Sequence, residues 1–189
     1  MRIISGKFKG QLLVEFRAGH IRPTTDRVKE SLFNKIMFEI EGTRVLDLFC
    51  GTGNLGLEAL SRGSTHVTFV DAHKQSILIT RDNIRKLKVE PSLYQIYQKD
   101  VLNYLRTFEG EPFEIIFADP PFTEKMAHDV MVVISQSKAC GDQTLVAIES
   151  EKRERMEETY GSLTRFDKKD FGDKFLSFFR KSEESIANE

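Results

Sequence analysis

Residues 44–56 read RVLDLFCGTGNLG, and this stretch decides the fold. Its first part, 44–49, is mostly apolar and predicts a buried β-strand. The glycines that follow predict a tight turn, and the apolar spacing at 55–62 predicts a helix. A strand that leads into a helix through a glycine turn is typical of α/β sheets that bind a ligand at the ends of their strands.

The alternation of strand and helix continues toward the C-terminus. We predict strands at 66–70, 93–97, 114–118 and 144–148, and helices at 74–87, after 100, at 126–137 and at 153–160. This spacing predicts a parallel sheet with helices on both faces. Two further apolar segments, 163–166 and 175–179, flank an Asp-Phe-Gly-Asp turn and predict an antiparallel hairpin that closes the sheet.

The sequence divides into three parts. Residues 1–41 predict a basic extension, in which a short β-hairpin or extended arm precedes a helix with apolar spacing from Val28 to Ile40. Residues 42–181 hold the α/β domain, and 182–189 form a polar tail. The predicted fold class is α/β: a doubly wound, mostly parallel, seven-stranded sheet with an antiparallel C-terminal hairpin and a small N-terminal extension.

The composition is that of a soluble globular protein. Of the 189 residues, 40% are hydrophobic and 30% charged, which suits one domain with a substantial core. No apolar run approaches the ~20 residues that span a bilayer, and the first residues lack the apolar core of a signal peptide. Cys50 and Cys140 show no metal-ligand spacing and are interpreted as reduced packing residues. We therefore expect a cytoplasmic protein that binds no metal.

Charge is unevenly distributed along the chain. The net charge is −1, but residues 1–29 hold seven Lys or Arg against Glu15 and Asp26, a local balance of +5 that leaves −6 on the remainder. A basic arm on an acidic body fits local contact with phosphates. A solvated terminal segment explains the same charges equally well, so charge alone leaves both interpretations open.

Asp47 precedes the glycines and indicates the kind of ligand. Gly51 and Gly53 let the backbone pass close to a ligand and adopt positive φ, although a glycine pattern alone is weak evidence. A carboxylate at Asp47 would repel a pyrophosphate but attract a cation. S-adenosylmethionine carries a sulfonium and an ammonium group and no phosphate, so we predict it as the cofactor.

Two more acids follow the next two strands. Asp71 ends the second strand, where a carboxylate can accept hydrogen bonds from both ribose hydroxyls. Asp100 follows the third strand, where it could accept from the adenine amino group. Each acid alone could instead be a helix cap or a loop residue. The residues predicted to bind the cofactor are Asp47, Phe49, Gly51, Gly53, Asp71, Ala72, Asp100, Val101 and Asp119.

The motif Asp119-Pro120-Pro121-Phe122 follows the fourth strand and is the most informative signal. Two prolines fix φ and remove two N–H donors, which leaves a stiff loop with carbonyl acceptors beside an aromatic ring. A plain turn at a strand end is the alternative. An exocyclic base amine is a poor nucleophile, because its lone pair is delocalised. Acceptors at its N–H groups expose that lone pair, and the ring holds the base in line with the sulfonium.

We therefore predict an amino-methyltransferase whose catalytic residues are Asp119, Pro120, Pro121 and Phe122. Four stretches resemble the RsmD-type 16S rRNA guanine-N2 methyltransferases, which are Rossmann-like class I enzymes. These are RIISGKFKG (2–10), IRPTTDRVKESLFN (21–34), VLDLFCGTGNLGLEALSRG (45–63) and FGDKFLSFF (171–179).

The resemblance covers about residues 1–181 and implies methylation of N2 of one guanine in 16S rRNA, with the partly assembled small ribosomal subunit as substrate. The product of the cofactor would be S-adenosylhomocysteine, and we expect a monomer. The family usually has Arg where this chain has Gln11, one phosphate contact fewer, and Ala where it has Cys50. The residues predicted to bind RNA are Arg2, Lys7, Lys9, Arg22, Thr24 and Arg27.

Three alternatives remain open. A DNA or RNA adenine or cytosine amino-methyltransferase uses the same four-residue motif, but the DNA enzymes commonly add a target-recognition domain for which this chain has little room. A nicotinamide-dependent oxidoreductase fits the spacing of Gly51, Gly53 and Gly56 but leaves Asp47 and the motif at 119–122 unexplained. A non-catalytic RNA-binding assembly factor would not need the cofactor acids.

Overall fold

The computed structural model describes residues 1–15, 26–121 and 126–182. The strands are β1 (Arg44–Leu48), β2 (His66–Asp71), β3 (Tyr94–Gln98), β4 (Phe113–Ala118), β5 (Cys140–Glu151), β6 (Thr159–Tyr160), β7 (Leu163–Asp170) and β8 (Lys174–Lys181). The helices are α1 (Asp26–Lys35), α2 (Asn54–Ser61), α3 (Lys74–Lys86), α4 (Val101–Arg106) and α5 (Ala127–Gln136), with a 3-10 turn η1 (Pro91–Leu93) before β3.

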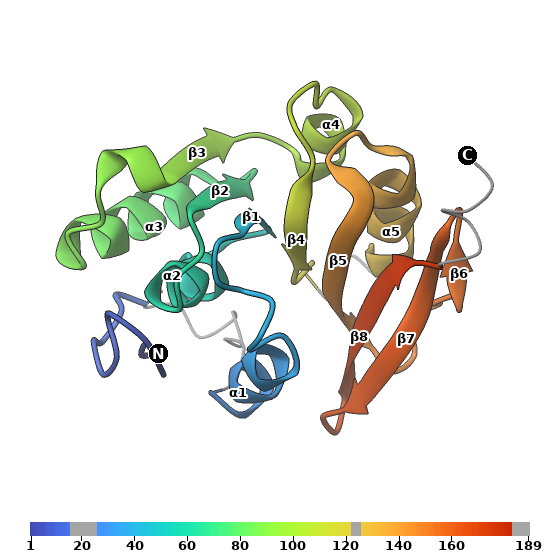
Figure 1. Ribbon diagram of the computed structural model, residues 1–189, viewed down its shortest axis with the longest axis horizontal. Helices are drawn as coiled ribbons and strands as arrows, with labels where there is room; N and C mark the ends of the chain where they lie inside the picture. Colours follow the sequence, from blue (N-terminus) through green and yellow to red (C-terminus); the bar gives the residue numbers. More distant parts are fainter. Residues whose placement is uncertain (16–25, 122–125, 183–189) are drawn as a thin grey trace.

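The strands form one sheet in the order β3-β2-β1-β4-β5-β8-β7-β6 (Figure 1). Strands β1 to β5 pair in parallel, whereas β8, β7 and β6 pair antiparallel at one end. The doubly wound α/β class and the antiparallel closing hairpin are thereby confirmed. Strand order reverses beside β1, so the carboxyl ends of β1 and β4 flank the crevice where such sheets bind ligands.

The sheet has eight strands rather than the predicted seven. The additional strand, β6, lies within the segment 153–160 for which we predicted a helix, so that prediction is wrong. Thr159 and Tyr160 pair with β7 across a turn at Gly161, whose φ is +56°. The Tyr160 ring is buried, and its hydroxyl accepts a hydrogen bond from the Glu157 N–H at 2.9 Å. Pairing with β7 and burial of this ring therefore override the local helical pattern.

Two element boundaries also differ from prediction. Helix α1 ends at Lys35, and turns replace the expected last helical residues, although Ile36 and Ile40 are still buried. Strand β5 extends beyond the predicted 144–148 at both ends, because Cys140 pairs with Phe113 of β4 at its start and residues 149–151 pair with β8 at its end.

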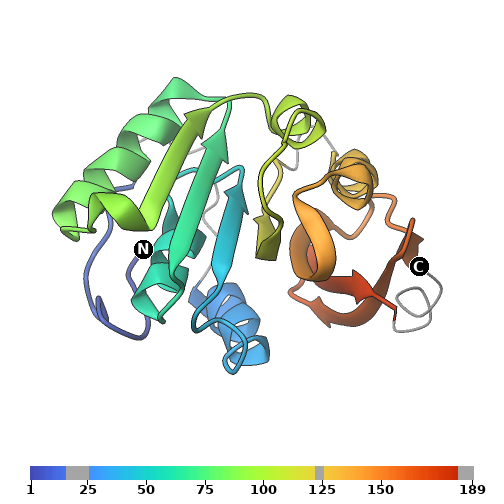
Figure 2. The ribbon, with the colours of Figure 1, turned by 45° about the horizontal axis from the view of Figure 1, so that its top comes forward.

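The helices cover both faces of the sheet. Helices α1, α2 and α3 pack on one face and α4 and α5 on the other (Figures 1 and 2). Gly56 lets α2 approach β2 closely, since a Cβ at this position would lie 2.4 Å from Cε1 of the buried Phe69. This close approach fixes the start of α2 against the end of β1, where the predicted cofactor site lies.

Residues 1–15, which we call the N-terminal segment, fold back on themselves through an antiparallel bridge between Arg2 and Leu12. Ile3 and Leu13 are buried in the same apolar cluster as α1, α2 and α3. The predicted hairpin-like arm is therefore packed against the α/β domain. None of the helices in the described ranges is both long and apolar enough to cross a bilayer.

Candidate active site

The loop between β1 and α2, residues 49–53, which we call the glycine loop, has an unusual backbone. Gly51 and Gly53 have φ values of +56° and +76°, as the sequence led us to expect, but Phe49 also has φ of +56°. A bulky residue with positive φ is a rare and strained conformation that a surrounding structure must hold in place. Strain of this kind is concentrated at ligand-binding sites, and here it lies at the reversal point of the sheet.

Asp47 lies at the floor of the site. Its carboxylate is 2% exposed, and one oxygen accepts a hydrogen bond from the N–H of Gly56 at 2.8 Å. Burial raises the pKa of the Asp47 carboxyl well above its usual range, the Gly56 bond opposes this, and the charges of Asp119 and Asp71 raise the pKa further. A buried carboxyl with two acidic neighbours is an environment that a bound cation would stabilise.

Asp71, the last residue of β2, bonds the backbone of the glycine loop. One carboxylate oxygen accepts from the N–H of Gly51 at 3.0 Å and the other from the N–H of His73 at 2.8 Å. The side chain is thus buried and fixed at the carboxyl end of its strand. Ala72, which follows, is exposed. A fixed carboxylate at this position can accept further hydrogen bonds from a ligand, because each oxygen has two lone pairs.

Asp119 belongs to the same group of acids. It follows β4 directly, is half-buried, and interacts electrostatically with Asp47. Pro120 is buried and Pro121 half-buried, so the stiff part of the motif packs against the domain. Phe122 lies outside the described residues. The structure therefore gathers Asp47, Asp71 and Asp119 at the carboxyl ends of three adjacent strands.

Asp100 and Val101 lie further along the same edge. Asp100 is exposed and caps α4, since its Oδ1 accepts from the N–H of Asn103 at 2.8 Å. Val101 is buried in the apolar cluster beneath α4. The cap uses only one carboxylate oxygen, so a role for Asp100 toward a ligand stays a prediction.

The backbone of the glycine loop leaves room for a ligand. An ideal Cβ at Gly51 would have Phe49 O at 3.8 Å as its nearest protein atom, whereas one at Gly53 would meet Thr80 Cγ2 at 3.0 Å. Among the described residues, Gly51 therefore leaves room for a ligand to approach its backbone, beside the carboxylate of Asp71. This room and the charge of the acids fit S-adenosylmethionine.

The predicted RNA-binding residues lie on or near the N-terminal segment. Arg2 is exposed and pairs with Asp26 at 3.4 Å, Lys7 lies over the ring of Phe8, and Lys9 is exposed. Arg27 is exposed, 5.9 Å from the centre of the Phe171 ring. Arg22 and Thr24 lie outside the described residues.

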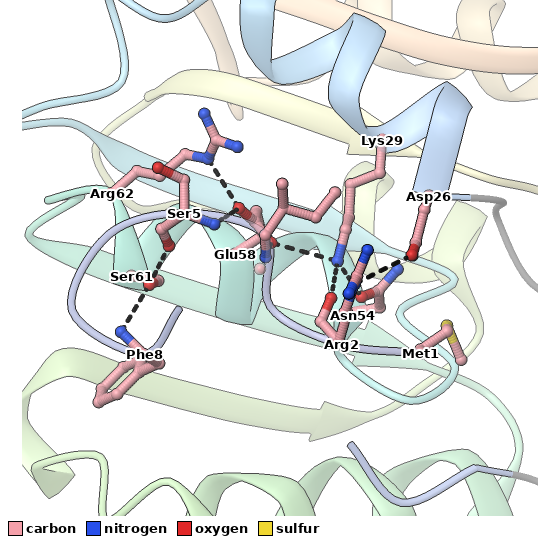
Figure 3. A network of polar contacts seen from close by, with 12 residues as sticks. Met1, Arg2, Ser5, Phe8, Asp26, Lys29, Asn54, Glu58, Ser61 and Arg62 are labelled. Atoms are coloured by element: carbon pink, nitrogen blue, oxygen red, sulfur yellow. Dashed lines mark hydrogen bonds and ion pairs between the residues drawn. The ribbon is translucent and has the colours of Figure 1, made fainter. Parts of the chain in front are cut away.

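Sequence reasoning missed a buried polar group beneath the site. Lys29, counted above among the basic residues of the arm, is 0% exposed and pairs with the equally buried Glu58 at 3.1 Å (Figure 3). Lys29 therefore adds nothing to a basic surface, and the surface charge of the arm is lower than the sequence suggested. The sequence signal that could have indicated this pair is Glu58, the acid in the largely apolar helix α2.

The two thiols are poor nucleophiles. Burial raises the pKa of Cys50 well above its usual range and that of Cys140 to about 11, which keeps both protonated at neutral pH. Within the described residues, no group of three or more His, Cys, Asp or Glu is arranged to hold a metal ion.

Several known proteins are similar to this chain over most of its length. The family model described as Conserved hypothetical protein 95 matches residues 1–180. A ribosomal RNA small subunit methyltransferase D from Haemophilus influenzae is 34% identical over 153 residues, which cover 80% of this chain and 79% of that protein. The same-named protein from Escherichia coli strain K12 is 32% identical, covering 80% and 75%. The structure of yhhF from Escherichia coli, a candidate methyltransferase, is 28% identical with a TM-score of 0.85, covering 96% and 98%.

Proposed function

Because this chain belongs to the Conserved hypothetical protein 95 family, which its motifs identify with the RsmD-type methyltransferases, we propose that it methylates an exocyclic base amine of ribosomal RNA. The cofactor is S-adenosylmethionine, which supplies an electrophilic methyl group on a sulfonium. The finer proposal is that the amine is N2 of a guanine in 16S rRNA, reached in the small ribosomal subunit.

The convergence of Asp47, Asp71 and Asp119 around the glycine loop carries this proposal. Asp47 attracts the positive charge of the cofactor, because the carboxylate is buried where water screens it little. Asp71 accepts hydrogen bonds from the ribose hydroxyls while it holds the N–H of Gly51. A pyrophosphate would be repelled by this set of acids, which disfavours a nicotinamide dinucleotide as the ligand.

Asp119 and the two prolines prepare the amine. The Asp119 carboxylate and a backbone carbonyl of the motif accept the two N–H groups of the base, which draws its lone pair out of the ring. Asp119 is close enough to Asp47 for their charges to interact, so the amine is held beside the cofactor bound at the glycine loop. The proton released on methylation passes to Asp119 or to solvent. A flipped-out or loop base can present its amine in this way, at a cost of a few kcal/mol if it leaves a duplex.

The test is methyl transfer from labelled S-adenosylmethionine to small subunits and to naked RNA taken from cells that lack the protein. Mass spectrometry of the nucleosides then identifies the product. N2-methylguanosine supports the full proposal. A methylated adenine or cytosine would retain the methyltransferase but refute the guanine assignment, and no methylation together with tight RNA binding would favour a non-catalytic assembly factor.

Asp119→Ala tests the assignment of the amine acceptor. We expect transfer to fall by about a thousandfold, while calorimetry finds the affinity for S-adenosylhomocysteine nearly unchanged. The matched control is Asp142→Ala. Asp142 is an exposed acid near the amino end of β5, whereas Asp119 lies at the carboxyl ends of the strands. Full activity of the Asp119 variant would show that the acceptor has been misassigned. Calorimetry with NADH separates the oxidoreductase, since tight NADH binding without a response to S-adenosylmethionine would end the proposal.

A further inference from the structure

A buried ion pair joins α1 to the helix that follows the glycine loop. Lys29 of α1 and Glu58 of α2 are both fully buried, and Lys29 Nζ lies 3.1 Å from Glu58 Oε2 (Figure 3). Burial lowers the pKa of the Lys29 ammonium, and the charge of Glu58 opposes that shift. Because burying two charges is costly unless their remaining hydrogen-bonding capacity is satisfied, the other partners of the pair matter.

Those partners belong to the N-terminal segment and to both ends of α2, where Arg62, the residue after the helix, pairs with Glu58 at 2.8 Å. Lys29 Nζ donates to the carbonyl of Arg2 at 2.5 Å and to Oδ1 of Asn54 at 2.8 Å. The two oxygens of Glu58 accept from the backbone N–H groups of residues 4–5 at 2.8 and 3.0 Å. The ion pair thus binds the N-terminal segment on one side and, on the other, the residue that directly follows the glycine loop.

A second polar bridge ties the other end of the segment to the loop itself. Asn83 of α3 is fully buried, and its Oδ1 accepts from the N–H of Val14 at 2.6 Å. Its Nδ2 donates to the carbonyl of Val14 at 3.1 Å and to the carbonyl of Thr52 at 2.9 Å. One amide side chain therefore fixes the position of the segment relative to the middle of the glycine loop.

The turn of the segment also presses against the far end of α2. The N–H of Lys7 donates to the carbonyl of Ser61 at 2.7 Å, and the hydroxyl of Ser61 donates to the carbonyl of Ser5 at 2.5 Å. Gly6 has φ of +80°, and a Cβ at this position would lie 1.7 Å from the Ser61 carbonyl oxygen. Only a glycine allows this contact, so the segment is docked along the whole length of α2.

We propose that the N-terminal segment is a positioning element of the cofactor site, which sets the shape of the glycine loop through Lys29 and Glu58 at one end and Asn83 at the other. The inference rests on the proposed function, because the ligand that reports on it is the proposed cofactor. Phe49 does not hold a positive φ by its own preference, although Gly51 and Gly53 adopt one readily. Lys29 and Asn83 bond the loop or the residue after it, and the segment fixes both, because Arg2 and Val14 accept from them.

Docking of the segment and binding of the cofactor must influence each other equally. If docking of the segment strengthens cofactor binding, then cofactor binding must strengthen docking of the segment by the same factor. S-adenosylhomocysteine should therefore slow hydrogen exchange at the N–H groups of Ile4 and Ser5, which bond Glu58 and do not belong to the glycine loop. The N–H groups of β7, which lies away from β1, report the global stabilisation that any ligand gives. Slowing at Ile4 and Ser5 no greater than in β7 would contradict the coupling.

The first experiment compares two alanine substitutions by calorimetry with S-adenosylhomocysteine. Gly6 and Gly10 have φ of +80° and +83°, so Gly6→Ala and Gly10→Ala impose similar backbone strain. A Cβ at Gly6 collides with α2, whereas one at Gly10 meets no atom of the described residues within 4 Å. We expect Gly6→Ala to weaken binding by about tenfold, within the usual range of coupling between sites, and Gly10→Ala to leave it nearly unchanged. Equal affinities of the two variants would overturn the inference.

The second experiment separates positioning from stability. Lys29→Met removes the fully buried partner of Glu58, leaves its carboxylate to Arg62 Nε at 2.8 Å, and should lower the melting temperature. Lys29→Met with Glu58→Gln removes both fully buried charges and should recover part of that loss. We expect the double variant still to bind S-adenosylhomocysteine about tenfold more weakly than the native chain. Recovery of native affinity together with stability would show that the pair matters for folding alone.

The chain offers a matched control for the second experiment. Lys181 of β8 and Asp142 of β5 form another ion pair, 2.6 Å apart, near the amino end of β5 and away from the carboxyl ends of the strands. The double variant Lys181→Met with Asp142→Asn should leave the affinity for S-adenosylhomocysteine unaltered. If the native chain binds no S-adenosylhomocysteine, the proposed function falls and the inference with it. If the native chain binds but the two glycine variants agree, only the inference falls.

Discussion

Substitution of Gly56 by alanine is a sharp test of how the glycine loop is held. Gly56 does not have a positive φ, so alanine is compatible with its backbone, and alanine favours a helix over glycine by about 1 kcal/mol. By propensity alone, Gly56→Ala should stabilise α2. The structure predicts the opposite, because of what the added Cβ would meet.

The added Cβ would lie 2.4 Å from Cε1 and 2.9 Å from Cζ of Phe69, and 2.7 Å from Cγ1 of Val67. Both residues are fully buried in the core, so neither can move aside freely. Overpacking of this kind costs roughly 1–3 kcal/mol, and three such contacts place the cost near the upper end. After the gain in helix propensity, we expect a net loss of about 2 kcal/mol in the free energy of unfolding.

Thermal denaturation followed by circular dichroism measures this loss. For a chain of this size, about 2 kcal/mol lowers the melting temperature by roughly 4–8 °C. Phe69→Leu removes the two ring atoms that collide, so Gly56→Ala should cost less in that background than in the native chain. A Gly56→Ala variant that melts at or above the native temperature would refute the packing argument.

Three further predictions concern single side chains. Asp47→Asn should weaken S-adenosylmethionine binding and remove the pH dependence of that binding. The raised pKa of Asp47 keeps its carboxyl protonated in the free protein above the usual pH range, whereas a cationic ligand favours the ionised form. The affinity of the native chain should therefore rise with pH until that pKa is passed, which calorimetry across pH will test. Asp100→Ala should lower the free energy of unfolding by about 1 kcal/mol through loss of the α4 cap. Cofactor affinity, measured by calorimetry, should fall as well; unchanged affinity would contradict the prediction that Asp100 accepts a hydrogen bond from the adenine amino group. Thr144→Val should lower the free energy of unfolding by about 2 kcal/mol, because the hydroxyl donates to the Phe113 carbonyl and accepts from the Gly141 N–H. Cofactor affinity should stay unchanged, and a change would contradict the placement of Thr144 near the amino end of β5, away from the acids.

The fold and the acids of the site could be predicted because local rules decide them. Alternating strands and helices imply a parallel sheet, and the ends of parallel strands meet at one edge. Asp47 is one residue from the end of such a strand, Asp71 ends one and Asp119 follows one, so their convergence follows from position in the sequence. Nothing in this inference needs knowledge of how side chains pack.

The features that were missed depend on tertiary contacts. Strand β6 forms because β7 offers it a partner, which local propensity at 153–160 does not reveal. The positive φ of Phe49 is imposed by the loop around it. Lys29 and Glu58 lie on different helices, and only the packing of α1 against α2 shows that a residue counted as part of a basic arm is buried in an ion pair.

The order in which the chain is synthesised gives the docked N-terminal segment a particular history. Ile4 and Ser5 bond a residue 53 to 54 positions later, and Val14 bonds one 69 positions later. At about 5–20 residues per second, translation reaches Asn83 about 3–14 seconds after Val14. Until α2 and then α3 have been synthesised, Ile3 and Leu13 lack part of the apolar cluster that buries them, so the segment reaches its docked position only after its partners emerge.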